Sequence, residues 1–274
     1  MQTSKSRRIA LITGGSSGIG LACVSKFLAN GWNVSVLALP GSELDRLTQD
    51  GVLATAGDVT CAGTRQAAIE RTLNVYGRID VLINNAGVGL YSPATEVPVD
   101  SFGRLMEVNV VAPLALAQLV IPVMLRQSSG TIISMGSVAG CVSLPWAAAY
   151  CASKSALHAI HDSLRRQLRG SSIHLIKVCP GIVNTKFREH VLAGSAPAEV
   201  RSIQRIVSAE LVAGRIWEAL VRRKTTVYVP RIGAAFALGG SLAPRLMDLY
   251  LARFDKRERQ IKSSLETTYE SQES

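Results

Sequence analysis

The sequence predicts a single α/β domain built on an open parallel sheet. Short apolar runs alternate with longer apolar-periodic stretches along most of the chain, which is typical of strands that alternate with helices. A glycine-rich turn joins the first strand to the first helix, as in sheets that bind a ligand at their carboxyl edge. The 274 residues, 47% of them hydrophobic, are enough for one large core.

The first predicted strand, Arg8 to Thr13, leads through the glycine turn Thr13–Gly20 into an apolar-periodic helix from Leu21 to Leu28. Glycine lets the backbone turn tightly and approach a ligand, and the free amides at the start of a helix suit a pyrophosphate. This placement indicates a dinucleotide site. The residues expected to contact the cofactor here are Gly14, Ser16, Ser17, Gly18, Ile19 and Gly20.

The second predicted strand, Asn33 to Leu39, ends where such a fold usually selects its cofactor. An acidic residue there holds the ribose hydroxyl of NAD, and a basic residue accommodates the 2′-phosphate of NADP. Ala38, Leu39 and Pro40 do neither. The absence of a carboxylate removes a repulsion against the phosphate, so the segment favours NADP slightly and leaves NAD open.

Two further strands, Val52–Ala56 and Val81–Ile83, end in polar or small residues. Asp58 is suited to accept a hydrogen bond from the adenine amino group, or to cap the helix predicted from Thr64 to Tyr76. The small residues of Asn84–Gly87 let the chain pass close beneath a cofactor. Expected cofactor contacts from these two ends are Asp58, Val59, Asn85, Ala86 and Gly87.

A long apolar-periodic helix is predicted from Val99 to Leu125, bent at Pro113. Asn109 lies inside it. Because a buried amide is costly without partners, Asn109 is either a structural tie or a holder of water in a proton path. The fifth strand, Thr131 to Met135, leads to Ser137, whose hydroxyl can fix and polarise a substrate oxygen.

Tyr150 and Lys154 are four residues apart on a helix predicted from Trp146 to Leu168, so they share one face. An ammonium held close to a phenol lowers its pKa and makes proton transfer to or from a carbinol oxygen feasible. The same spacing also fits a Tyr150 that only packs the helix against its neighbours and a Lys154 that lies on the surface in solvent. A sixth strand, His174 to Cys179, then ends at Pro180, at the edge that the other strand ends share.

Together, these motifs resemble those of the classical short-chain dehydrogenases/reductases (SDRs), from about Arg8 to Pro230. The turn fits T-G-x-x-x-G-x-G, Asn84–Gly87 matches N-N-A-G, and Pro180-Gly181 matches P-G. The positions that match the catalytic tetrad are Asn109, Ser137, Tyr150 and Lys154. The resemblance implies a Rossmann-type, doubly wound sheet of seven parallel strands, with Thr226–Val229 as the last strand.

The resemblance also implies roles. Tyr150 would be the acid/base, Lys154 would bind the nicotinamide ribose and lower the pKa of Tyr150, and Ser137 would hold the substrate oxygen. Asn109 would anchor a proton-relay water. The cofactor contacts that it adds are Tyr150, Lys154, Pro180, Gly181, Val183 and Thr185. It further implies a small carbonyl or alcohol substrate, and a homodimer or homotetramer formed through the two long helices.

The expected organisation is an SDR domain over residues 1–230, a helical extension over 231–262 and a disordered tail over 263–274. Residues 186–208 are expected to cover the substrate. Within the extension, the apolar run Ile232–Ala243 is too short to span a bilayer. With the basic stretch Arg245–Lys262, it suits a lid, an oligomer contact or a peripheral membrane contact. The amino terminus shows no secretion signal, so a cytoplasmic protein is expected.

A net charge of +10 raises the question of an anionic partner. The basic residues gather in Arg165–Arg169, Arg222–Lys224 and Arg253–Lys262, without the interleaved aromatics that stack on bases. No nucleic-acid partner is therefore expected. The five cysteines form no C-x-x-C pair, and His158 and His161 alone make a weak ligand pair. Reduced thiols and no metal are expected.

The sequence thus predicts an NAD(P)-dependent oxidoreductase that moves a hydride between the nicotinamide and a carbonyl or secondary alcohol. One alternative is a membrane-associated reductase of lipid ketones, of the acyl-dihydroxyacetone phosphate, steroid or retinoid type. Another is a non-catalytic dinucleotide-binding sensor, because a fold alone does not determine function. A sensor has no need of the full set of four catalytic residues.

Overall fold

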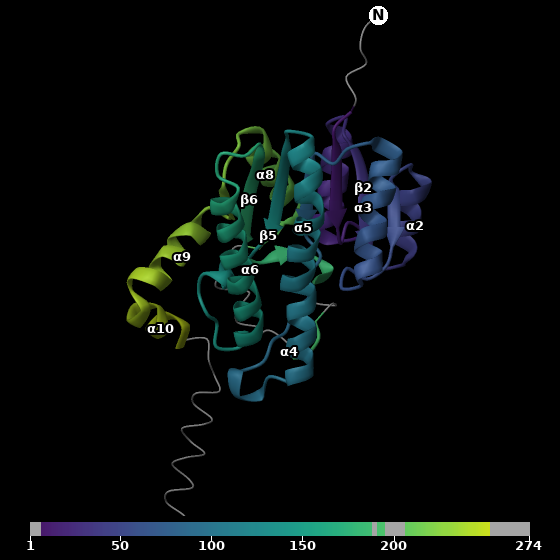
Figure 1. Ribbon diagram of the computed structural model, residues 1–274. Coiled ribbons are helices and arrows are strands. Elements are labelled where there is room, and N and C mark those ends of the chain that lie inside the picture. Colours follow the sequence, from purple (N-terminus) through teal and green to yellow (C-terminus); the bar gives the residue numbers. More distant parts are fainter. Residues whose placement is uncertain (1–6, 188–190, 195–205, 253–274) are drawn as a thin grey trace, which may run out of the picture.

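A computed structural model describes residues 7–187, 191–194 and 206–252 of the chain. Its centre is one sheet of seven parallel strands in the order β3-β2-β1-β4-β5-β6-β9 (Figure 1). The strands are β1 Ile9–Thr13, β2 Asn33–Ala38, β3 Leu53–Ala56, β4 Val81–Asn84, β5 Gly130–Met135, β6 Ile173–Pro180 and β9 Thr226–Val229. The order reverses between β1 and β4, which confirms the predicted doubly wound α/β sheet.

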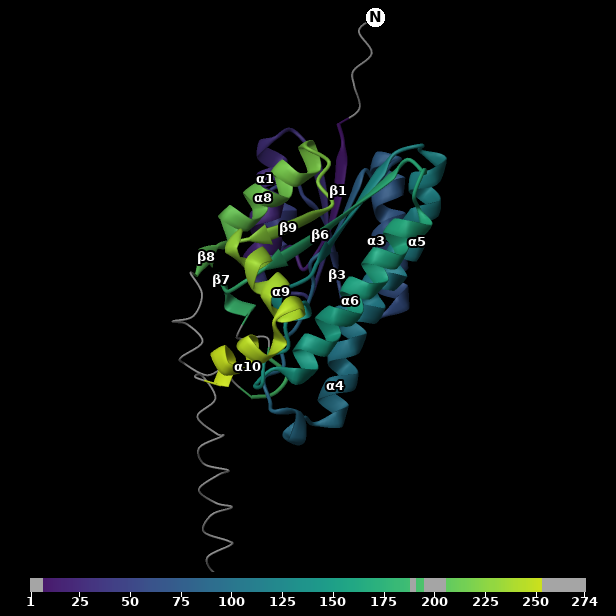
Figure 2. The same cartoon turned by 90° about the vertical axis from the view of Figure 1, so that its left-hand side faces the viewer.

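Helices cover both faces of this sheet, as Figure 2 shows. On one face α1 and α8 pack against each other, and on the other lie α3, α5 and α6. Helix α2 packs beside β3. The bounds are α1 Gly18–Ala29, α2 Ser42–Gln49, α3 Ala62–Tyr76, α5 Ala112–Arg126, α6 Ala148–Gln167 and α8 Ala209–Val221. Because both faces are covered, β1 and β4 are buried along their whole length, which explains why they read as continuous apolar runs.

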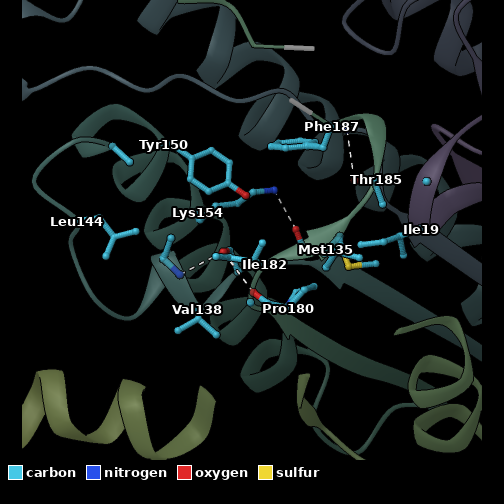
Figure 3. Close-up of a pocket in the computed structure, with 18 of the residues that line it drawn as sticks. Ile19, Met135, Val138, Leu144, Tyr150, Lys154, Pro180, Ile182, Thr185 and Phe187 are labelled. Carbon is cyan, nitrogen blue, oxygen red and sulfur yellow. Dashed lines mark hydrogen bonds between the residues drawn. The ribbon is translucent and has the colours of Figure 1, made fainter. Parts of the chain in front are cut away.

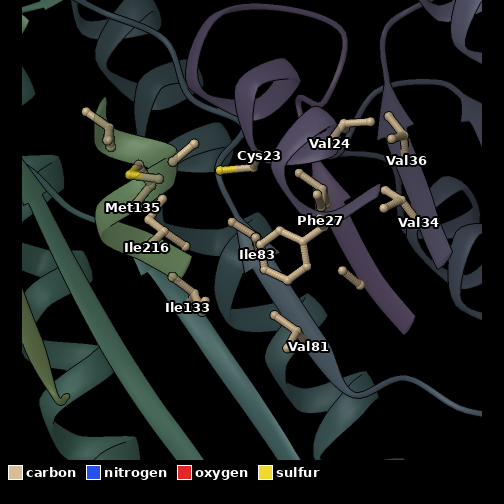
Figure 4. Close-up of a cluster of buried hydrophobic side chains, with 14 of the residues drawn as sticks. Cys23, Val24, Phe27, Val34, Val36, Val81, Ile83, Ile133, Met135 and Ile216 are labelled. Carbon is tan, nitrogen blue, oxygen red and sulfur yellow. The ribbon is translucent and has the colours of Figure 1, made fainter. Parts of the chain in front are cut away.

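The larger buried cluster lies between the sheet and the pair α1 and α8 (Figure 4). Phe27 of α1 is fully buried beside Val81 and Ile83 of β4. Its ring also meets Trp32 and Trp217 edge to face, with ring centroids 5.2 Å apart in both pairs. These aromatic contacts hold the first helix, and with it the glycine turn, against the sheet.

The predicted helix from Val99 to Leu125 is interrupted. Helix α4 (Val99–Met106) passes through a π-helical turn, Glu107–Val111, into α5. Pro113 lacks an N–H and cannot bond to the carbonyl of Asn109, so the ladder widens just before the proline. The predicted helix thus forms, with a π-helical turn just before Pro113, and Asn109 lies in this widened turn.

The run Val99–Arg126 is long and apolar enough to cross a membrane by length and composition, yet 56% of its most apolar window is buried inside the protein. Helix α5 packs on β4, β5 and β6. The run therefore has the burial of a core helix in a globular domain.

After β9 the chain forms α9 (Ile232–Leu242) and α10 (Pro244–Ala252), drawn in yellow to one side of the sheet in Figure 1. The part of the predicted extension that the structure describes is thus helical. Residues 253–262 and the predicted tail 263–274 lie outside the described residues, as do residues 188–190 and 195–205 of the predicted substrate cover. A short strand just before this segment, β7 (Val183–Asn184), pairs with a short strand at its end, β8 (Val207–Ser208).

Candidate active site

The glycine turn is tied to the end of β4 by three hydrogen bonds to Thr13. Its hydroxyl accepts from the backbone N–H groups of Asn85 and Ala86, both at 3.0 Å, and its carbonyl accepts from the Asn85 side-chain amide at 2.9 Å. A Cβ at Gly20 would overlap the carbonyl oxygen of Gly14. The Asn84–Gly87 segment thus braces the glycine turn, and Gly20 is needed to close that turn.

The start of α1 is suited to a phosphate group. Ser17 at the N-cap makes no side-chain capping bond, and the first turn carries no acidic residue. The first amides of the helix therefore lack an intramolecular acceptor, and no carboxylate competes for them. Gly14 and Gly18 adopt φ of 63° and 51°, values that residues with a Cβ rarely take. These features fit the pyrophosphate of a dinucleotide.

Ser137 joins the ends of β5 and β6. Its hydroxyl accepts from the Ala139 N–H at 3.1 Å, which caps the short 3₁₀ turn Val138–Gly140, and it donates to the Pro180 carbonyl at 3.5 Å. Its backbone N–H donates to Nε2 of His158 at 3.4 Å. The side chain is therefore held in one orientation at the shared edge of the sheet.

Tyr150 and Lys154 lie on the same face of α6, as predicted. The Lys154 ammonium is 5.7 Å from the centroid of the Tyr150 ring and donates to the Met135 carbonyl at 3.0 Å (Figure 3). Lys154 is only 4% exposed. Burial lowers the pKa of Lys154 to about 8.

The expected depression of the Tyr150 pKa is not what this geometry produces. Removal of the hydroxyl from water raises the pKa of Tyr150 above its usual value, Tyr91 adds to the rise, and a hydrogen bond with Ser137 opposes it. Lys154 lies over the ring and its own charge is disfavoured by burial. Tyr150 is therefore held as a neutral phenol, which is the form that donates a proton.

Asn109 is fully buried and its side chain binds the backbone of Val88 in both directions. The amide oxygen accepts from the Val88 N–H and the amide nitrogen donates to the Val88 carbonyl, each at 3.0 Å. The nitrogen also donates to the Ser153 hydroxyl at 3.1 Å. Of the two roles considered for Asn109, these bonds favour the structural tie, which joins the π-helical turn to α6 and to the loop after β4.

Within the protein, Asp58 binds Thr60 and Arg104. One oxygen of its carboxylate accepts from the N–H and the hydroxyl of Thr60, both at 2.9 Å, and the other pairs with Arg104. Both neighbours lower the pKa of Asp58 despite the opposing effect of burial. Helix α3 begins after Cys61, with no side-chain cap, so the capping role predicted for Asp58 was wrong.

A cavity of about 250 Å³ opens at this edge of the sheet (Figure 3). It brings together the glycine turn, the end of β4, the serine of the 3₁₀ turn, the tyrosine and lysine of α6 and the segment after β6. The predicted catalytic and cofactor residues all line it except five. These five are Ser16, Gly20, Asp58, Val59 and Asn109.

This set of residues in one cavity is accompanied by a match to a known family. The sequence profile described as "short chain dehydrogenase" matches residues 8–195. The chain belongs to the short chain dehydrogenases. It is therefore a member of an oxidoreductase family, and the resemblance drawn from its motifs is confirmed.

Known proteins similar to this short chain dehydrogenase include 2-(R)-hydroxypropyl-CoM dehydrogenase of Xanthobacter autotrophicus. The two are 35% identical over 222 residues, which is 74% of this chain and 89% of that protein. A crystal structure of an SDR from Burkholderia phymatum in complex with NAD has a TM-score of 0.76 and 27% identity, covering 90% of this chain and 95% of that one. Serine dehydrogenase complexed with NADP⁺ has a TM-score of 0.70 and 26% identity, covering 80% and 93%.

The individual side chains of the cavity's outer wall were not predicted from the sequence. The wall is formed by aromatic and aliphatic side chains from loops and from the carboxyl-terminal helices, namely Tyr91, Leu144, Trp146, Phe187, Phe236 and Leu251. Tyr91 and Phe187 place their rings 6.2 Å and 6.1 Å from that of Tyr150. No local motif marks such residues, because any apolar residue on a neighbouring segment can serve. The available signals were the predicted substrate cover, residues 186–208, and the apolar run Ile232–Ala243.

Proposed function

We propose that this SDR is an NAD(P)-dependent oxidoreductase that moves a hydride between the nicotinamide and a carbonyl or secondary alcohol carbon. The observation that carries the proposal is the convergence of Ser137, Tyr150 and Lys154 on one cavity with the glycine turn. A module that only bound a dinucleotide would need the turn but not the hydroxyl pair at the far end of the cavity.

The chain's own residues supply the proton and the orientation. Ser137, fixed by Ala139 and Pro180, presents its hydroxyl to the substrate oxygen and polarises it. Tyr150, neutral at physiological pH, donates its proton to that oxygen when a carbonyl is reduced. The ammonium of Lys154, held on Met135, favours the phenolate that remains. When bound, the nicotinamide supplies or accepts the hydride.

Cofactor binding rests on the glycine turn and the uncapped start of α1, which fit a pyrophosphate. Among similar structures, the Burkholderia protein was crystallised with NAD and serine dehydrogenase with NADP⁺. We favour NADP because Leu39, exposed at the end of β2, offers no carboxylate to repel a 2′-phosphate. Separate titrations with NADPH and NADH, followed by the fluorescence of the reduced nicotinamide, distinguish the two.

Replacing Tyr150 with Phe tests the reaction. We expect cofactor affinity within about twofold of wild type and turnover reduced by at least about 10²–10⁴-fold, since general acid catalysis contributes that much. The matched control is Tyr76→Phe, at the end of α3 and away from the cavity. Retained turnover in the Tyr150 variant would remove the tyrosine from the mechanism. Binding of neither cofactor by the wild type would overturn the enzyme assignment itself.

A second candidate, a lipid ketone reductase that works at a membrane surface, is favoured by the carboxyl-terminal helices. Phe236 of α9 and Leu251 of α10 line the cavity. The other sides of these helices carry five aliphatic residues that are each more than half exposed, namely Ile232, Leu238, Leu242, Leu246 and Leu249. The sequence after α10 is rich in Lys and Arg. An apolar face beside basic residues is suited to the surface of an anionic bilayer.

Point substitutions test this candidate better than truncation, because truncation would also remove part of the cavity wall. The variant Leu238→Gln/Leu242→Gln/Leu246→Gln should lose most of its binding to vesicles that contain phosphatidylserine. The matched control places three glutamines at exposed valines elsewhere, Val75, Val99 and Val221. Equal vesicle binding by the two triple variants would exclude α9 and α10 as the membrane contact.

A further inference from the structure

Behind residues 136–140, the loop after β5 that carries Ser137 (the serine loop), the fold brings together two thiols and an imidazole that are far apart in the sequence. Cys141 follows the 3₁₀ turn, His158 lies on α6, and Cys179 is near the end of β6. One ligand atom from each residue lies within 4.8 Å of the others. None of the three lines the active-site cavity. The cluster is therefore separate from the site that binds substrate.

The three side chains are already in mutual contact. Cys141 Sγ is 3.8 Å from Nδ1 of His158, and Cys179 Sγ is 3.7 Å from Nε2. The hydroxyl of Tyr228, on β9, is 3.9 Å from Cys141 Sγ. A tetrahedral Zn²⁺ with bonds of about 2.3 Å to sulfur and about 2.0 Å to nitrogen separates a sulfur from a nitrogen ligand by about 3.6 Å. The two observed separations involve opposite nitrogens of the imidazole, so one ion can bind both sulfurs only if one thiol shifts toward the nitrogen that the other thiol contacts.

Burial also suits a metal. His158 is 7% exposed and Cys179 is fully buried, whereas Cys141 is half-buried and gives access from solvent. The imidazole is held tightly, because a Cβ at Gly136 would overlap Nε2 and a Cβ at Gly140 would lie 2.6 Å from Cε1. Two of the three ligands are thus fixed, and the accessible thiol is the one that can adjust to the ion.

From this cluster we propose a Zn²⁺-class binding site, formed by Cys141, His158 and Cys179, that inhibits the enzyme when it is filled. Two thiolates and one imidazole are the donors that zinc prefers. Tyr228 or water completes the coordination. The sequence showed no such site because its spacing is non-local, and the ligands meet only when β6 and α6 pack beside the serine loop.

The inhibition follows from the hydrogen bond that His158 makes to the serine loop. Nε2 accepts from the backbone N–H of Ser137. A neutral imidazole that ligates a metal through one nitrogen keeps its proton on the other. Zinc on Nε2 occupies the acceptor directly, and zinc on Nδ1 places a proton on Nε2. In both cases Ser137 loses this acceptor, and the loop that presents its hydroxyl is displaced.

Binding is measured with Co²⁺ in place of Zn²⁺, with the thiols kept reduced. We expect a sulfur-to-cobalt charge-transfer band that saturates at one equivalent and that Zn²⁺ removes. Cys141→Ser and Cys179→Ser should lower the affinity by more than about tenfold, since even an outer-shell change costs about 10–100-fold. Cys61→Ser, at an exposed thiol outside the cluster, is the matched control. Thermal melting followed by circular dichroism verifies that each variant is folded.

The absence of a charge-transfer band in the reduced wild type overturns the site, as does an unchanged band in folded Cys141→Ser. This readout needs no turnover, so it is independent of the proposed reaction. The inhibitory role rests on that reaction: Zn²⁺ should lower turnover of the wild type and of Cys61→Ser, reversibly on chelation, and should spare Cys141→Ser. Saturated zinc binding with unchanged turnover would overturn the coupling to Ser137.

Discussion

Lys154 donates a hydrogen bond from its ammonium to the backbone carbonyl of Met135 at 3.0 Å, and this bond joins the helix of Tyr150 to the strand that leads to Ser137. The lysine is thereby held in the protein interior, where burial lowers its pKa from 10.5 to about 8. The fold therefore stabilises Lys154, a residue of the proposed mechanism, poorly in its charged form.

A pH dependence of stability follows. Between about pH 8 and 10.5 the unfolded chain binds more protons at Lys154 than the folded chain does, so the free energy of unfolding rises with pH across this window. Below about pH 8 both states are protonated and the folded state bears the full cost, about 3 kcal/mol at 1.36 kcal/mol per pKa unit. We expect Lys154→Met to be more stable than wild type by about 1–3 kcal/mol at neutral pH, after loss of the bond to Met135.

Urea unfolding of wild type and Lys154→Met at several pH values from about 7 to 10 measures this difference. The difference in free energy of unfolding between the two proteins should shrink as the pH rises toward 10.5, because Lys154 of the folded wild type is then neutral. Lys26→Met, in the last turn of α1, serves as control for the removal of a lysine elsewhere in the chain. A difference that does not change with pH would show that the lower stability of the wild type does not come from the charge on Lys154.

Replacing Ser137 with Ala should reduce turnover by about 10²–10³-fold, the usual loss when one donor to a developing oxyanion is removed. It should also cost about 1 kcal/mol of stability, since the hydroxyl caps the turn Val138–Gly140. Steady-state kinetics and urea unfolding measure the two effects. Ser155→Ala, at an exposed serine that binds the Gly140 carbonyl, is the control and should keep its turnover. A Ser137 variant that keeps full activity would exclude it from substrate positioning.

Gly20→Ala should weaken cofactor binding by at least about tenfold, because a Cβ there meets the Gly14 carbonyl oxygen and the Asn85 side chain and so opens the glycine turn. Gly63→Ala in α3 is a matched control, since its Cβ would meet no atom within 4 Å. That change should raise stability by about 0.5–1 kcal/mol. Nicotinamide fluorescence and thermal melting separate the two outcomes. Equal cofactor affinity in both variants would mean that the turn does not contact the cofactor.

Phe27→Ala should destabilise the protein by about 3–5 kcal/mol, because the ring is fully buried and packs against Trp32 and Trp217. Val75→Ala, on the exposed surface of α3, should change stability by less than about 0.5 kcal/mol. Denaturant unfolding followed by tryptophan fluorescence reports on the cluster directly. A small loss at Phe27 would show that the neighbouring side chains collapse into the space.

The chemistry-bearing motifs were predictable because each is local. A strand, a glycine turn and a helix are adjacent in the sequence at Thr13–Gly20, and helical periodicity alone puts Tyr150 and Lys154 on one face. Six of the strands were predicted from apolar runs, which are typical of strands covered on both faces, and the seventh, Thr226–Val229, was predicted from the family resemblance. Ser137 and Pro180 could be placed at one edge because parallel strands share their carboxyl ends.

Tertiary packing decided the rest. Asp58 does not cap α3, and its carboxylate pairs with Arg104, a residue 46 positions away that no local pattern connects with it. The pKa of Tyr150 rose because desolvation by burial, with a smaller contribution from Tyr91, outweighs the hydrogen bond with Ser137. Packing of distant segments also forms the part of the cavity wall that Phe236 and Leu251 supply. It likewise brings together Cys141, His158 and Cys179. Sequence periodicity specifies which face of an element is apolar. The packed fold decides which elements meet and how far water is excluded from their contact.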